Sequence, residues 1–215
     1  MPVFTVALIA LNVAVFLYEL NLLSQGPRLL QQFIDHMAMF PEHVAHDFGR
    51  DAVRTIFTSM FLHGGLLHIG GNMLYLWVFG NNVEDSMGHF RFLVFYLLCG
   101  VAAAAGHVIV SPDSSVPTMG ASGAIAGVLG AYLLLFPSAR IDTWIPIFWL
   151  ALTTIQVPAY FFLVFWFILQ VINALPLLAF ESVKEPVAWW AHIGGFVAGV
   201  ILTPILKRRE VRLFQ

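Results

Sequence analysis

Residues 119–136 read MGASGAIAGVLGAYLLLF and decide the fold of this chain. The run contains no charged residue and approaches the length of about 20 apolar residues at which a helix crosses the hydrocarbon core of a bilayer. Ser122 stands near its start, where a hydroxyl becomes a useful nucleophile only if a base lies beside it. The stretch therefore predicts a membrane span and directs attention to polar partners elsewhere in the chain.

The composition of the whole chain is that of a membrane protein. Of its 215 residues, 60% are hydrophobic and 10% are charged, and the mean hydropathy is +0.85. Soluble domains carry about 25% charged residues, so lipid must solvate most of this surface. The net charge of −2 and the lack of a basic stripe give no indication of a nucleic-acid partner. The single cysteine, Cys99, lies in an apolar run and is interpreted as a packing residue.

Six segments have the length and composition of membrane spans. The sequence predicts them at residues 4–23, 60–83, 92–110, 119–136, 158–178 and 187–206. We predict one all-α domain over residues 1–215, a polytopic membrane helical bundle with an outer loop at 24–59 and a tail at 207–215. The first segment starts almost at Met1 without a basic region or a cleavage site, so we interpret it as a retained span. A shorter apolar stretch at 144–154 is expected to lie at the membrane interface or to form a short hairpin.

Basic residues predict the orientation of the bundle. Four of them directly follow the last predicted span: Lys207, Arg208, Arg209 and Arg212. The positive-inside rule assigns such a cluster to the cytoplasm, and six spans then place both termini there. The exceptions lie in the loop assigned to the outside: Arg28, Arg50 and Arg54. We predict a multi-pass protein of a prokaryotic plasma (inner) membrane.

Polar residues from three predicted spans fall at one depth. The second, fourth and sixth spans run in the same direction, from outside to inside. Ser122 and His192 lie a few residues into the fourth and sixth spans, several ångströms below the outer surface at about 1.5 Å per residue. His68 and Asn72 lie about a third of the way into the second span. An ionisable imidazole in hydrocarbon marks a candidate functional site, so we expect these four residues to meet.

Glycine pairs beside this serine and this histidine allow their spans to approach. Gly123 and Gly127 follow the serine, and Gly195 and Gly199 follow the histidine. Small residues four apart let membrane helices come close together. Close approach would bring the serine Oγ within about 2.6–3.2 Å of the imidazole, the separation of a nucleophile and its base.

The remaining polar pair can complete a hydrolytic site. His68 and Asn72 share one helix face because they are four residues apart. Each can donate an N–H to a developing oxyanion, and the backbone N–H of Ser122 can be a third donor. No Asp or Glu in the predicted spans is placed to orient His192, so the predicted mechanism uses a serine–histidine dyad.

Three motifs in six-span order resemble those of the rhomboid intramembrane serine proteases: Gly120-Ala121-Ser122-Gly123, Ala191-His192-Ile193-Gly194-Gly195 and His68-x3-Asn72. The resemblance covers nearly the whole chain. It implies that the serine is the nucleophile, the histidine the base, and the His68–Asn72 pair part of the oxyanion hole. It also implies that the partners are the lipid bilayer and transmembrane protein substrates, cleaved in or near their membrane segments.

The chain departs from the family pattern at two positions. Val53-Arg54 stands where the family usually has Trp-Arg in the first outer loop. Ala126 stands where some members have an aromatic residue that packs against the catalytic imidazole. Another group must therefore hold His192 in this chain.

Other interpretations of the same residues remain open. Ser122 in a Gly/Ala-rich run can serve packing, and His192, or the His68–Asn72 pair, can join spans through polar contacts. As functions, a catalytically silent rhomboid-like protein could bind client membrane helices, and a small transporter could relay protons through His68, His107 and His192. Catalytically silent relatives lack the serine or the histidine, and this chain has both. A proton-relaying transporter usually needs a carboxylate within the membrane.

Two histidine pairs could suggest a metal site. His63 lies near His68, and His43 lies near His46. Neither pair has a convincing carboxylate or cysteine partner to complete a closed site. We therefore predict no metal and no cofactor.

Overall fold

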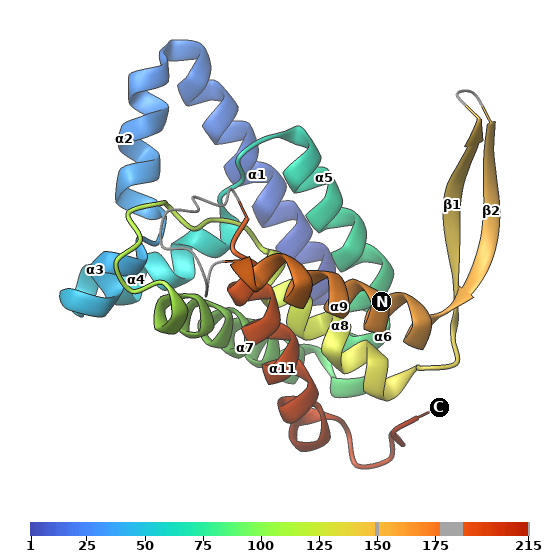
Figure 1. Ribbon diagram of the computed structural model, residues 1–215. Coiled ribbons are helices and arrows are strands. Elements are labelled where there is room, and N and C mark those ends of the chain that lie inside the picture. Colours follow the sequence, from blue (N-terminus) through green and yellow to red (C-terminus); the bar gives the residue numbers. More distant parts are fainter. Residues whose placement is uncertain (149–150, 177–186, 215) are drawn as a thin grey trace.

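The computed structural model describes residues 1–148, 151–176 and 187–214, without the side chains of residues 144–152. The described chain is mostly helical and forms a bundle, which confirms the predicted all-α class (Figure 1). Three of its helices are long and apolar enough to cross a membrane: α1 (Val3–Gln25), α7 (His89–Val110) and α11 (Trp189–Leu206). Two shorter apolar helices accompany them: α8 (Ser122–Leu135) and α9 (Ala159–Ala174). The count of six spans stays a prediction.

The predicted outer loop contains three short helices: α2 (Pro27–Met37), α3 (Pro41–His46) and α4 (Arg50–Thr58). Gly26 adopts φ 149° between α1 and α2, a conformation that glycine reaches without steric cost. The chain reverses there, and the two helices form a V at the top of Figure 1. Tyr18 and Phe33 join the arms of the V through an edge-to-face ring contact of 5.3 Å. The rest of the loop returns to the bundle, where α3 and α4 pack against α7.

The helix of the second predicted span begins later than residue 60. The segment starts with a single turn, η1 (Ser59–Phe61), and a bend at Gly64 and Gly65. A continuous helical segment follows: α5 (Leu66–Tyr75), the π-helical turn η2 (Leu76–Gly80) and α6 (Asn81–Met87). The two glycines disfavour helix at the predicted start. As a result, His63 lies just before the bend, whereas His68 and Asn72 lie on the helix.

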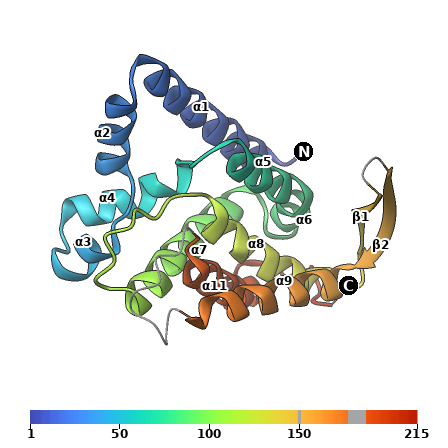
Figure 2. The same cartoon turned by 45° about the horizontal axis from the view of Figure 1, so that its top comes forward.

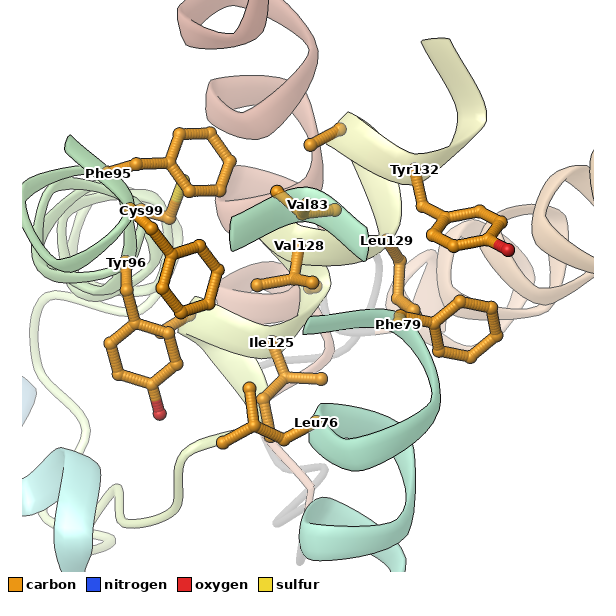
Figure 3. Close-up of a cluster of buried hydrophobic side chains, with 14 of the residues drawn as sticks. Leu76, Phe79, Val83, Phe95, Tyr96, Cys99, Ile125, Val128, Leu129 and Tyr132 are labelled. Carbon is orange, nitrogen blue, oxygen red and sulfur yellow. The ribbon is translucent and has the colours of Figure 1, made fainter. Parts of the chain in front are cut away.

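Helix α8 occupies the centre of the bundle, and most of its side chains are buried. In Figure 3, Val128 and Leu129 lie between Tyr96 of α7 and Phe79 of η2. Phe79 also meets Tyr132 edge to face, with ring centroids 4.9 Å apart. Within a bilayer such contacts stabilise the bundle by dispersion and close packing. Neighbours on several sides therefore hold the helix that begins at Ser122.

Helix α1 buries three polar residues, whereas most of its apolar residues are exposed or half-buried. Thr5, Asn12 and Glu19 are buried, and their seven-residue spacing places them on one helix face. A helix in lipid has this inverted pattern because an uncompensated polar group in hydrocarbon costs several kcal/mol. The three polar side chains therefore lie where other parts of the bundle can bind them.

The N-terminal end of α1 is held by a buried carboxylate of α6. Glu84 Oε2 accepts the N–H and the O–H of Thr5, both at 2.7 Å. Its other oxygen accepts the N–H of Phe4 at 2.9 Å and lies 2.6 Å from Nδ1 of His89. The first N–H groups of a helix have no acceptor within the helix, so Glu84 stabilises the start of α1.

The stretch between α8 and α9 forms a β-hairpin that extends from the side of the bundle (Figure 1). Strands β1 (Arg140–Phe148) and β2 (Ala151–Pro158) pair antiparallel, with Arg140 opposite Pro158 and a bulge near Pro146. Of the two possibilities for residues 144–154, the structure has the hairpin. It begins before that stretch and ends after it.

The helices of the last three predicted spans are shorter than those spans. Helix α8 begins at Ser122 and α11 begins at Trp189. Helix α9 begins directly after Pro158, and the predicted end of its span at residue 178 lies outside the described residues. Figure 2 shows α8 beside both α7 and α9, with α11 near all three.

Candidate active site

Helices α8 and α11 touch through their backbones. A Cβ atom on Gly195 would overlap the carbonyl oxygen of Gly123, and a Cβ atom on Gly199 would overlap that of Gly127. Only glycine at positions 195 and 199 permits this crossing. The close approach expected from the two glycine pairs is therefore present, and it sets the separation of the residues at the start of each helix.

Ser122 and His192 meet above this crossing. Ser122 is the first residue of α8, and His192 lies in the first turn of α11. The serine Oγ lies 2.8 Å from Nε2 of the imidazole, within the range of a nucleophile and its base. Both side chains are half-buried.

The other imidazole nitrogen of His192 has a partner that the sequence analysis did not identify. Nδ1 lies 2.8 Å from Oε1 of Gln170, a buried residue of α9. The rings of Trp166 and Trp189 lie beside the imidazole, with centroids 5.9 Å and 6.0 Å from it. These neighbours hold His192 where Ala126 offers no aromatic ring. The sequence contained a signal for this role. Gln170 is a polar residue inside an apolar run, as His68 and Asn72 are.

His68 lies against the backbone of Gly120, two residues before the serine. The N–H of Gly64 donates to its Nδ1 at 3.3 Å, so the neutral imidazole carries its proton on Nε2. A Cβ atom on Gly120 would come within 2.8 Å of Nε2, and 3.6 Å from Oγ of Ser122. Gly120 also adopts φ 125°, a conformation that side chains other than glycine rarely adopt. Glycine is thus required at position 120 both for the chain path and for the imidazole.

Asn72 is buried and belongs to a polar network behind the site. Its Nδ2 lies 3.0 Å from Nε2 of His63, which therefore accepts and carries its own proton on Nδ1. The backbone N–H of His63 in turn donates to both carboxylate oxygens of Glu19, at 3.3 Å each. His63 was expected only as a metal candidate, and Glu19 was not expected at the site. One hydrogen of the Asn72 amide is engaged in this network, and the second is available to a ligand.

A cavity of about 670 Å³ lies at this site. Its lining includes all four predicted site residues: Ser122, His192, His68 and Asn72. Trp166 and a largely apolar set of side chains complete the wall. A concave, mainly apolar pocket with a few convergent polar groups is typical of a binding or active site. The structure therefore brings the four residues together, while their chemical roles remain predictions.

Other residues named from the sequence lie elsewhere. Arg54 pairs with Asp51 at 3.1 Å on the exposed part of α4 and does not line the cavity. His46 meets Asp113 at 2.8 Å on the surface. Buried His107 belongs to α7, and its Nδ1 has no hydrogen-bond partner among the described residues. In the described part of the chain, no three His, Cys, Asp or Glu residues gather as metal ligands would.

The fold and the site define a class: a multi-pass membrane protein with a serine–histidine pair facing a cavity within its helical bundle. The Rhomboid domain family matches residues 50–209. That range is most of the chain and contains all four site residues. The protein belongs to the rhomboid family.

Curated relatives from bacteria and mitochondria are similar to this chain. Rhomboid protease GluP of Bacillus subtilis is 41% identical over 85 residues, covering 40% of this chain and 16% of the relative. Rhomboid protein 1, mitochondrial, of Saccharomyces cerevisiae is 29% identical over 221 residues, covering 96% of this chain and 56% of the relative. The mitochondrial presenilin-associated rhomboid-like protein of Bos taurus is 34% identical over 85 residues, covering 39% of this chain and 22% of the relative. The chain thus spans little more than half of these relatives at most.

Proposed function

We propose that this protein is an intramembrane serine endopeptidase that hydrolyses peptide bonds in or near the transmembrane segments of other membrane proteins. The observation that carries the proposal is the 2.8 Å contact between Oγ of Ser122 and Nε2 of His192 at a cavity that His68 and Asn72 also line. Membership of the rhomboid family supports it. The similarity to the Bacillus subtilis rhomboid protease GluP supports it further.

In the first step of the proposed reaction, Oγ of Ser122 attacks the scissile carbonyl carbon. His192 accepts the hydroxyl proton on Nε2 as the new C–O bond forms. The protonated imidazole then gives that proton to the leaving amine as the C–N bond breaks. A water molecule, with His192 again as its base, hydrolyses the resulting ester and frees the serine.

The oxyanion of the tetrahedral intermediate needs donors that are already in place. Nε2–H of His68 and the free N–H of the Asn72 amide face the cavity in this role. The backbone N–H of Ser122 is the third donor, since the first residue of a helix has no acceptor for it within the helix. The positive end of the α8 dipole points the same way and favours negative charge there.

The proposed substrates are themselves membrane helices. Their backbone groups are satisfied internally while they cross lipid, so a bond reaches Ser122 only after local unwinding. Substrates with helix-weakening Gly, Pro or polar residues near a small residue at the cut are expected. We also propose the finer features of location: six spans, both termini in the cytoplasm, and a prokaryotic plasma membrane.

The test is cleavage of a model transmembrane substrate by purified protein in detergent. Wild type should cleave, Ser122→Ala should not, and Ser24→Ala should behave as wild type because Ser24 is exposed at the end of α1. A fluorophosphonate that labels Ser122 provides a second readout. If wild type neither cleaves several substrates nor reacts with the fluorophosphonate, the proposal fails, and the alternative of a catalytically silent protein that binds client helices is favoured.

A further inference from the structure

We infer that Gln170 is a positioning residue that makes His192 a base toward Ser122, and this inference rests on the proposed hydrolytic function. Gln170 lies on α9, whereas the serine and the histidine lie on α8 and α11. The serine–histidine dyad alone involves two helices. With Gln170, three helices contribute to one continuous chain of hydrogen bonds.

The orientation of the Gln170 amide follows from its two contacts. Its Nε2 donates to the backbone carbonyl of Trp166 at 3.0 Å, one turn earlier on the same helix. Its Oε1 is thereby directed at Nδ1 of His192, at 2.8 Å. An amide oxygen only accepts hydrogen bonds, so Nδ1 must carry the imidazole proton.

The tautomer decides what the imidazole can do to the serine. With the proton on Nδ1, the lone pair of Nε2 faces Oγ of Ser122 and can take its hydrogen. With the proton on Nε2, the imidazole would donate to Oγ and could not act as a base. Gln170 selects the first arrangement, and it can hold Nδ1–H in the same way after the imidazole has become cationic.

The burial of Gln170 fixes the orientation of its side-chain amide. The side chain is buried, whereas the residues on the opposite face of α9, such as Phe161, Phe165 and Ile172, are exposed. A buried amide that lost either partner would carry an unsatisfied polar group in the interior, which is unfavourable. The ring of Trp166, on the same helix, also lies beside the imidazole at a tilt of 36°. The orientation of His192 therefore depends on the position of α9.

The experiment measures the rate at which a fluorophosphonate labels Ser122 in the full-length protein. In that reaction Oγ forms a bond to phosphorus, the P–F bond breaks, fluoride leaves, and His192 takes the serine proton. The rate reports base activation without any need to bind a protein substrate. Gln170→Met keeps the side-chain length and removes the acceptor. It should slow labelling about 10- to 100-fold, by analogy with the loss on removing partners that orient metal-binding histidines.

Two variants separate positioning from packing. Gln170→Glu should label within about fivefold of wild type, because a carboxyl group can accept from Nδ1–H in either protonation state. Gln170→Asn, which is one methylene too short, should be as slow as Gln170→Met. With a cleaved substrate, kcat should fall while KM stays nearly constant.

Asn173 provides the matched control. It lies on the same helix, also donates to the carbonyl one turn earlier, and is exposed. Asn173→Leu should label within about twofold of wild type, as expected of a surface change. The inference is overturned if Gln170→Met and Gln170→Asn label as fast as Asn173→Leu, or if Gln170→Glu is as slow as they are. If wild type is not labelled at all, the proposed function fails, and this inference fails with it.

Discussion

The two halves of the candidate site are positioned by different physical means. The serine and the histidine are placed by steric contact, since glycine backbones of α8 and α11 touch directly below them. The proposed oxyanion donor Asn72 is placed by hydrogen bonds, since Asn72 is held by His63 and His63 is held by Glu19. At the steric contact, any atom added to a glycine would clash. In the hydrogen-bonded chain, a residue can be replaced by another that accepts a hydrogen bond at the same place. The two halves should therefore fail differently under mutation.

The largest effect on activity is expected for mutation of Asn72, which belongs to the hydrogen-bonded half of the site. Asn72→Ala removes one oxyanion donor, and loss of such a donor typically lowers kcat by about 10²- to 10³-fold. The KM for a transmembrane substrate should change little, because the bond forms mainly in the transition state. The measurement is steady-state cleavage in detergent.

Asn82→Ala is the matched control for that change, since Asn82 lies on α6 and bonds to the hydroxyl of Tyr132 away from the cavity. It should retain nearly full activity. A loss of less than about threefold in Asn72→Ala would remove Asn72 from the oxyanion hole.

A second prediction tests the steric half. Gly195→Ala adds one methyl group against the carbonyl oxygen of Gly123 and must push α11 away from α8. A displacement of about 1 Å between catalytic groups can lower activity about 10²-fold, so we expect a loss of that size. The measurement is the cleavage rate together with fluorophosphonate labelling of the serine.

Gly70→Ala is the control for the steric prediction, because a Cβ atom on Gly70 meets nothing within 4 Å. It should fold and cleave normally. Equal activity of the two alanine variants would show that the crossing does not set the geometry of the pair.

A third prediction, with the smallest effect, separates the two kinds of positioning. Glu19→Gln keeps an oxygen that can accept the N–H of His63, whereas Glu19→Leu removes it. Loss of one hydrogen bond is worth about 1 kcal/mol, so Glu19→Leu should lower kcat by roughly fivefold and Glu19→Gln by less than twofold. The rates of both variants relative to wild type give the comparison. Equal losses would mean that Glu19 acts through its charge or volume and not as an acceptor for His63.

The meeting of Ser122 and His192 could be anticipated because its signals are local in sequence. Each is a polar residue near the start of an apolar run, and each is followed by glycines at helical spacing. These signals also predicted which two helices approach each other. The helical class followed from the apolar runs alone.

The partners of these residues could not be assigned because nothing local says which helix faces they share. Gln170 is 22 residues from His192, and Glu19 is 44 residues from His63. Both are polar residues in apolar runs, and this signal was present in the sequence although neither residue was predicted to belong to the site. The late start of α5 has a different origin, since the two glycines of the bend outweigh the hydropathy of the segment.

The length of α8 has a consequence for the lipid around the protein. Its 14 residues make a helix of about 21 Å, while a hydrocarbon core is about 30 Å thick. When its Leu135 end reaches one boundary of that core, Ser122 lies about 9 Å inside the other. Longer acyl chains carry this serine further from the headgroups, and shorter chains bring it closer. The thickness of the host membrane therefore sets the depth of Ser122 below the membrane surface. In the proposed reaction, the substrate bond and water must both reach that depth.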